Sequence, residues 1–62
     1  MMPTARVVEI DPIPMHVPLG YQRCVQVHCP HCGRGHWHAF PGVNDDGRRV
    51  APCGQTYRIA FA

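Results

Sequence analysis

Four cysteines in a chain of 62 residues constrain its fold more than any other feature. Two of them, Cys29 and Cys32, are separated by Pro-His and followed by Gly33. This spacing predicts a tight turn whose two sulfurs converge on one point, with Gly33 adopting the positive φ that such a turn needs. Far along the chain, Cys53 is again followed by glycine, which predicts a second turn of the same kind.

The chain is also too short to build a large core. A domain of this size buries only about 60% of the surface that its unfolded form exposes, so many such domains need disulfides, a metal ion or a partner chain. The first residues lack the apolar core of a secretion signal, which predicts a cytoplasmic protein, and no apolar run is long enough to span a membrane. Disulfides do not persist in a reducing cytoplasm. The thiols therefore predict a metal site, with one structural Zn²⁺ as the cofactor.

Zinc prefers four tetrahedral sulfur and nitrogen ligands, so three cysteines and one histidine form the expected set. His36 and His38 are predicted to lie on the same face of one short strand, with Trp37 on the other face. We favour His38 because it begins the segment that returns to Cys53, and His36 is the alternative. The predicted ligands are Cys29, Cys32, His38 and Cys53.

Proline and glycine occupy 13 positions, which excludes a long helix and predicts short strands joined by turns. Strands are expected at residues 21–28, 36–40, 48–51 and 57–61. In the first of them Val25 and Val27 alternate with Cys24. Cys24 is the other candidate for the fourth ligand, but the strand would have to bend for it to reach the metal, so we favour a free thiol. Residues 1–20 are interpreted as a proline-rich arm with a short strand at 6–10 that adds to the sheet as an edge. Residues 21–62 form the expected metal-binding domain.

The segment from residue 27 to residue 59 resembles small zinc-ribbon or zinc-finger proteins encoded by actinobacteria and their phages. The resemblance rests on the Cys-Pro-His-Cys-Gly turn at Cys29, the His-Trp-His triplet at His36 and the Arg-Val-Ala-Pro-Cys stretch that ends at Cys53. Ala39 departs from the pattern, because such sequences often carry glycine after the second histidine. The resemblance implies a zinc ribbon: a small all-β, metal-stabilised domain with two β-hairpins and short knuckle turns, held by these cysteines and one of the two histidines.

The predicted function is a non-enzymatic, zinc-stabilised binding module whose partner is a protein. A formal net charge of +2 is far from the strongly basic balance that makes phosphate binding expected on charge alone. The resemblance implies a phage-encoded regulator directed at a host protein, such as the transcription machinery. The alternative is a nucleic-acid-binding zinc ribbon, in which arginines contact phosphates and an aromatic ring stacks on an unpaired base. Its candidate contact residues are Arg34, Arg48, Arg49, Arg58 and Trp37.

Catalytic functions have less support. The Cys-Pro-His-Cys tetrapeptide also occurs in thiol–disulfide oxidoreductases, but their reactive thiol needs a helix N-terminus, and Gly33 and Gly35 disfavour a helix here. A catalytic zinc needs a neighbouring acid or base, and the only glutamate of the chain, Glu9, lies outside the metal segment. The C-terminal strand could pair with a second chain as an exposed edge, so the oligomeric state stays open.

Overall fold

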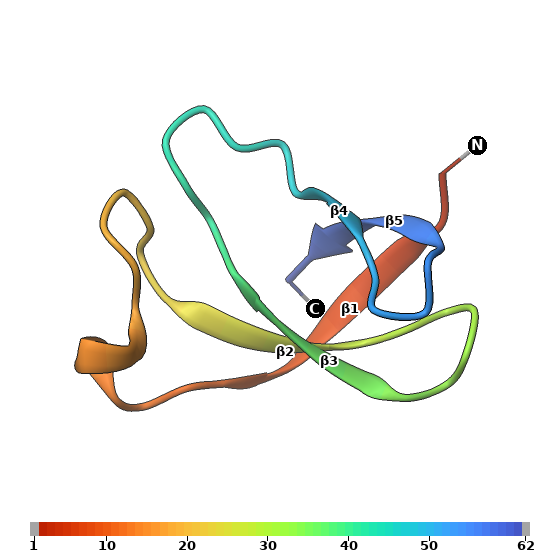
Figure 1. The fold of residues 1–62 in the computed structure, drawn as a ribbon, viewed down its shortest axis with the longest axis horizontal. Coiled ribbons are helices and arrows are strands. Elements are labelled where there is room, and N and C mark those ends of the chain that lie inside the picture. The colour runs from red at the N-terminus through yellow and green to blue at the C-terminus, as the bar shows by residue number, and fades with distance from the viewer. Residues whose placement is uncertain (1, 62) are drawn as a thin grey trace.

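The computed structural model describes residues 2–61 and forms one mixed β-sheet of five strands (Figure 1). The strands are β1 (Thr4–Ile10), β2 (Cys24–His28), β3 (Gly35–Ala39), β4 (Arg48–Val50) and β5 (Thr56–Ala60). One short 3-10 turn, η1 (Pro14–His16), interrupts the proline-rich segment between β1 and β2. The prediction of an all-β fold is confirmed for the described residues, none of whose helices is long and apolar enough to cross a membrane.

The strand order is β3-β2-β1-β5-β4, so two antiparallel hairpins, β2–β3 and β4–β5, lie on either side of β1. β1 runs antiparallel to β2 and parallel to β5. The prediction of an added edge strand at residues 6–10 was wrong, because this segment is the central strand of the sheet. The reason is burial: Ala5 pairs with Ile59 and Val7 pairs with Val27, so β1 connects the apolar residues of the two hairpins.

Strand β2 begins three residues later than the pattern predicts. Tyr21 forms an isolated bridge with Gly42, and the N–H of Gln22 donates to the carbonyl of Pro41 at 2.9 Å. Residues 21–23 therefore contact the loop that follows β3 before the regular pairing of β2 with β3 begins. The other three predicted strands coincide with β3, β4 and β5 to within one residue at each end.

One face of the sheet, the inner face, carries the core. The buried apolar side chains are those of Ala5, Val25, Val27, Cys29, Phe40, Ala51, Tyr57 and Ile59. Residues directly opposite each other in the register point to the same side, so His36 shares the inner face with Val27 and His38 shares it with Val25. Trp37 and its partner Gln26 point to the other side, which we call the outer face. All five strands belong to this sheet, so no strand among residues 2–61 covers the outer face.

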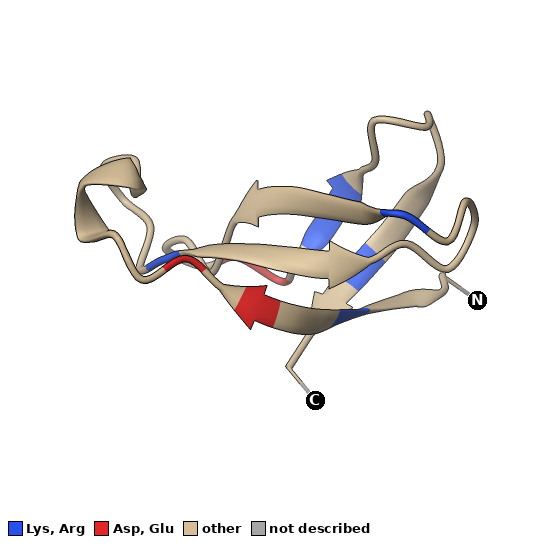
Figure 2. Ribbon diagram, turned by 90° about the horizontal axis from the view of Figure 1, so that it is seen from below, with Lys and Arg blue, Asp and Glu red and all other residues tan. Residues whose placement is uncertain are grey.

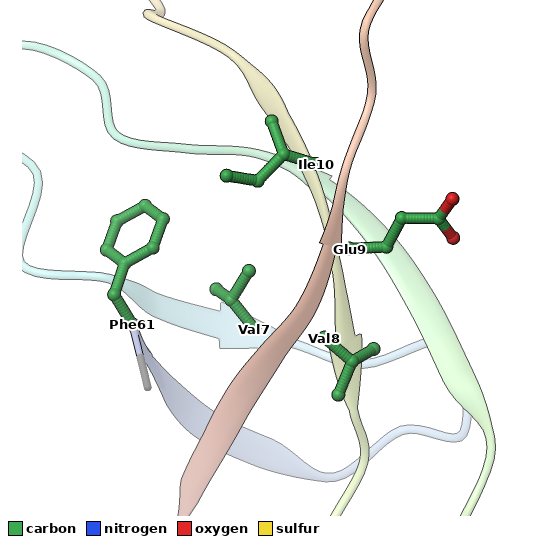
Figure 3. A pocket seen from close by; sticks show the side chains of 5 residues that line it. All are labelled: Val7, Val8, Glu9, Ile10 and Phe61. Carbon is green, nitrogen blue, oxygen red and sulfur yellow. The ribbon is translucent and has the colours of Figure 1, made fainter.

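A β-bulge at Val8 changes which side chains of β1 face the core. The register shifts between Val7 and Glu9, so Glu9 lies opposite Gln26 on the outer face and Ile10 lies opposite an inner-face residue of β2. Figure 3 shows Val7 and Ile10 on the side of β1 that faces Phe61, with Glu9 on the other side. These residues line a shallow, largely apolar depression next to the C-terminal end of β5.

The loop between β3 and β4 is held together by Asp45. Its carboxylate accepts hydrogen bonds from the backbone N–H groups of Gly42 (3.0 Å) and Gly47 (2.8 Å) and forms an ion pair with Arg49 of β4. Arg49 also donates to the carbonyl of Ala39 at 3.0 Å, which connects β4 to the end of β3. The hydrogen bonds from the Arg49 guanidinium hold the pKa of Asp45 well below its usual range, although burial acts in the opposite direction.

Candidate metal centre

The turns of the two hairpins lie at the same end of the molecule (Figure 1). The ligand atoms of Cys29, Cys32, His36 and Cys53 all lie within 4.8 Å of one another. The sulfurs of Cys29 and Cys53 are 3.8 Å apart, and the Cys32 sulfur is 3.3 Å from His36 Nε2. In a tetrahedral zinc site two sulfurs are about 3.8 Å apart, and a sulfur and a nitrogen are about 3.6 Å apart. The four donor atoms therefore fit around one metal ion.

The first turn, between β2 and β3, is closed by its own backbone. The N–H of Cys29 donates to the carbonyl of Arg34 at 2.9 Å, and the carbonyl of Cys29 accepts from the N–H of Gly33 at 3.1 Å. The N–H of Cys32 points to the Cys29 sulfur at 3.5 Å. Gly33 has φ of 75°, which confirms the predicted need for glycine at this position. These contacts hold the two sulfurs side by side.

The second turn, between β4 and β5, presents Cys53. The N–H of Gly54 donates to the carbonyl of Ala51 at 2.8 Å, and Gly54 has φ of 89°, so this turn also depends on glycine. The two turns are connected by His31, whose Nε2 lies 2.9 Å from the carbonyl oxygen of Thr56 and donates its proton to it. The sequence suggested no role for His31, because only the folded chain brings Thr56 next to it.

The structure places His36, the alternative, at the cluster, and not the favoured His38. His36 lies next to the first turn, opposite Val27, whereas His38 lies opposite Val25 with its Nε2 2.6 Å from the hydroxyl of Tyr57. Two residues along a strand correspond to about 7 Å, so the two imidazoles cannot occupy the same place. The histidine closer to the Cys-x-x-Cys turn stays beside the sulfurs, and the more distant one reaches the core.

The protonation of the thiols reflects their crowding. Burial acts to raise the pKa of Cys29, but hydrogen bonds from the backbone of Cys32 and His31 and contacts with the Cys32 and His36 side chains lower it to about 6. The backbone of Arg34 acts to lower the pKa of Cys32, but burial and the neighbouring Cys29 sulfur raise it. One thiolate therefore forms readily, and its charge opposes the deprotonation of the neighbouring thiol. A bound cation removes this conflict, because it stabilises all the thiolates at once.

Cys24 lies apart from the cluster. It is the first residue of β2, its side chain is on the outer face opposite Ala39, and its Sγ–H donates to the carbonyl of His16 at 3.4 Å. The structure therefore separates this thiol from the three that converge, as the sequence predicted.

The five predicted contact residues do not form one surface. Arg34 lies in the first turn beside the metal cluster. Arg49 points to the inner face, where it is paired with Asp45 and is not available to a ligand. The remaining three residues are exposed on the outer face: Arg48, Arg58 and Trp37.

No family model, curated protein or solved structure matches this chain. The resemblance to zinc-ribbon proteins of actinobacteria and their phages therefore stays a prediction. What the structure shows is an all-β domain in which three cysteines and one histidine could hold one metal ion.

Proposed function

We propose that this chain is a non-enzymatic binding module whose fold is stabilised by one Zn²⁺ bound to Cys29, Cys32, His36 and Cys53. The observation that carries the proposal is the convergence of these four donor atoms within 4.8 Å from two separate hairpin turns. Three thiolates and an imidazole are soft and borderline ligands, which favour zinc over the hard cations Mg²⁺ and Ca²⁺.

A structural role for the ion is supported by the closed donor set. Structural zinc sites have four protein ligands, whereas catalytic ones keep one position for water or substrate. The cluster contains no carboxylate within residues 2–61, and Glu9 is turned to the outer face. The ion would join Cys29 and Cys53, which are 24 positions apart in the chain, so its binding energy would contribute directly to folding.

The proposal includes a zinc-ribbon fold that differs from a simple pair of hairpins. Two hairpins supply the ligands through short turns, as in a zinc ribbon, and the parallel pairing of β1 with β5 joins the hairpins into one sheet. The open outer face and the loops then remain available to a partner.

Native mass spectrometry of the purified chain tests the zinc site. We expect one zinc ion per chain, lost on chelation together with the β-sheet circular dichroism signal. His36→Ala and His38→Ala form a matched pair: the first variant should lose the ion and the second should retain it. Replacement by Co²⁺ should give the intense visible absorption of tetrahedral thiolate coordination. A chain that stays folded with no bound ion and with all thiols open to alkylation would contradict the proposal.

A protein partner, which the sequence favours, is supported by a second observation. We define the apolar tip as the side chains of Met15, Leu19 and Val43, which are 85%, 100% and 82% exposed. The bridge between Tyr21 and Gly42 holds together the two loops that carry them, at the opposite end from the metal cluster (Figure 1). Contiguous apolar patches are typical of protein contact surfaces, and we propose that these three side chains form one.

Affinity capture from an actinobacterial lysate tests the apolar tip. We expect a stoichiometric protein that binds the wild type and is lost in Leu19→Asp. Val50→Asp is the control, since Val50 is exposed on β4 and lies outside the tip. If no stoichiometric protein is recovered, or if both variants lose it equally, the apolar tip is not the contact surface.

A further inference from the structure

The strand order brings together cationic side chains from the two ends of the chain on the outer face. Arg48 of β4 lies directly opposite Arg58 of β5, and Arg58 lies opposite Thr4 of β1. Arg6 is two residues beyond Thr4 and therefore points to the same side, where it lies opposite His28 of β2. We define the cationic row as Arg48, Arg58 and Arg6, all exposed, on three neighbouring strands, with His28 of β2 next to its end.

The cationic row is only partly neutralised by the protein itself. Arg48 Nε lies 2.7 Å from a carboxylate oxygen of Asp46 in an exposed ion pair. Within residues 2–61, Arg6 and Arg58 form no ion pair. Like charges directly opposite in an antiparallel pair are destabilising. Asp46, whose pKa both Arg48 and Arg58 lower, offsets part of this repulsion, and a bound anion would offset more of it. Figure 2 shows most of the basic ribbon in the half of the sheet nearer the N-terminus, with the acidic ribbon toward the other end.

Trp37 adds an aromatic surface to the same face. Its indole is 50% exposed and shares the outer face with its partner Gln26. Gly35, which lies opposite His28 at the end of the cationic row, is two residues before Trp37 on β3. The Gln26 side chain lies over Gly35, so an amide group is placed between the indole and the cationic row. A base that stacks on Trp37 would thus have a hydrogen-bonding group beside it.

We propose that the outer face binds single-stranded nucleic acid, with phosphates along the cationic row and an unpaired base stacked on Trp37. This ligand supplies both features, because each of its nucleotides carries a phosphate and an unpaired base, whereas a duplex keeps its bases paired. The inference rests on the proposed zinc module, which holds the two hairpins in one sheet. The proposed binding surface excludes Arg49, whose guanidinium is paired with Asp45. It includes Arg6, which the sequence analysis did not suggest.

Trp37 is the only tryptophan of the chain, so its fluorescence reports binding directly. The probe is an oligothymidylate of about 15 nucleotides added to the zinc-loaded full chain. We expect quenching of the tryptophan emission and an affinity whose logarithm falls linearly with the logarithm of salt concentration, with a slope of about −0.7 per phosphate contacted. A duplex of equal length should bind more weakly and quench less.

Single substitutions locate the surface. Arg6→Ala and Arg58→Ala should each reduce the magnitude of the salt slope by about 0.7. Arg23→Ala removes the same charge from a residue outside the cationic row, whose guanidinium lies over the Phe61 ring, and should leave the slope unchanged. Trp37→Ala, measured by the anisotropy of a labelled oligonucleotide, should lose roughly 5- to 150-fold in affinity. Zinc content and circular dichroism of each variant show that its fold is intact.

Three results would overturn this inference. The first is that the oligonucleotide does not change the tryptophan fluorescence of the zinc-loaded, folded protein. The proposed zinc module would then be unaffected, but its target would be a different one. The second is a duplex that binds as tightly as the single strand, which contradicts base stacking. The third is polyglutamate that competes as well as the oligonucleotide, which assigns the outer face to an acidic protein. Failure of the wild type to bind zinc would instead contradict the proposed module.

Discussion

The Nε2 of His38 and the hydroxyl of Tyr57 lie 2.6 Å apart, although β2 and β1 separate their strands in the sheet. The two rings meet edge to face with their centroids 5.6 Å apart. A flat sheet cannot make this contact, so the sheet curls around its inner face and brings β3 toward β5. The same curvature brings the turns of the two hairpins together at the metal cluster.

Loss of the Tyr57 hydroxyl should destabilise the protein without removing the metal. Burial and the nearby thiols raise the pKa of Tyr57 to about 12, and burial lowers the pKa of His38, so the pair is neutral near pH 7. Tyr57→Phe leaves the half-buried imidazole without its partner, which costs about 1–3 kcal/mol in the free energy of unfolding. Chemical denaturation of the zinc-loaded protein measures this cost. Tyr21→Phe, at an exposed tyrosine, is the control and should change stability by less than about 0.5 kcal/mol.

Cys24 and Cys53 should differ in their response to substitution and to alkylation. Cys24→Ser should retain one zinc ion, because the Cys24 sulfur contacts the His16 carbonyl and not the cluster. Cys53→Ser should lose the ion and unfold. In the zinc-loaded wild type, iodoacetamide should modify Cys24 first, which mass spectrometry of the peptides will show. Zinc lost from Cys24→Ser but kept by Cys53→Ser would mean that the ligand set is incorrect.

Two adjacent aspartates make unequal contributions to stability. Asp45→Ala removes the ion pair with Arg49 and leaves the N–H groups of Gly42 and Gly47 without their acceptor, at a cost of about 2–4 kcal/mol. Asp46→Ala removes an exposed ion pair with Arg48 and an exposed hydrogen bond from the Arg48 N–H, and should cost much less because water screens both contacts. Thermal denaturation of the two variants makes the comparison. Equal losses would show that the loop does not depend on Asp45.

The contribution of Asp45 should also depend on pH. Hydrogen bonds from Arg49 hold its pKa below the usual value of 3.8, so the stabilisation is fully present above that value and is lost as the pH falls toward the lowered pKa. The difference in melting temperature between the wild type and Asp45→Asn should therefore be constant from pH 7 to about pH 5 and shrink in more acidic solution. Protonation of the thiols affects both proteins alike and cancels in the difference. A difference that grows on acidification has the wrong sign for this ion pair.

Features that depend on neighbours in the chain could be predicted from the sequence. The Cys-x-x-Cys turn closes through its own backbone, so Cys29 and Cys32 are side by side whatever the rest of the chain does. The alternation in β2 directs Val25 and Val27 inward, because successive side chains of a strand point to opposite faces. His36 and His38 lie on one face and Trp37 on the other for the same reason.

The tertiary structure decided the relations between distant segments. Parallel pairing of Ala5 with Ile59 makes β1 the central strand, and no local pattern in residues 6–10 distinguishes a central strand from an edge. The curvature of the sheet carries His38 to Tyr57 and leaves His36 beside the sulfurs. Local spacing thus determined which residues share a turn or a face, whereas the pairing of strands far apart in the chain determined which of them meet, because only the folded core selects one pairing among many.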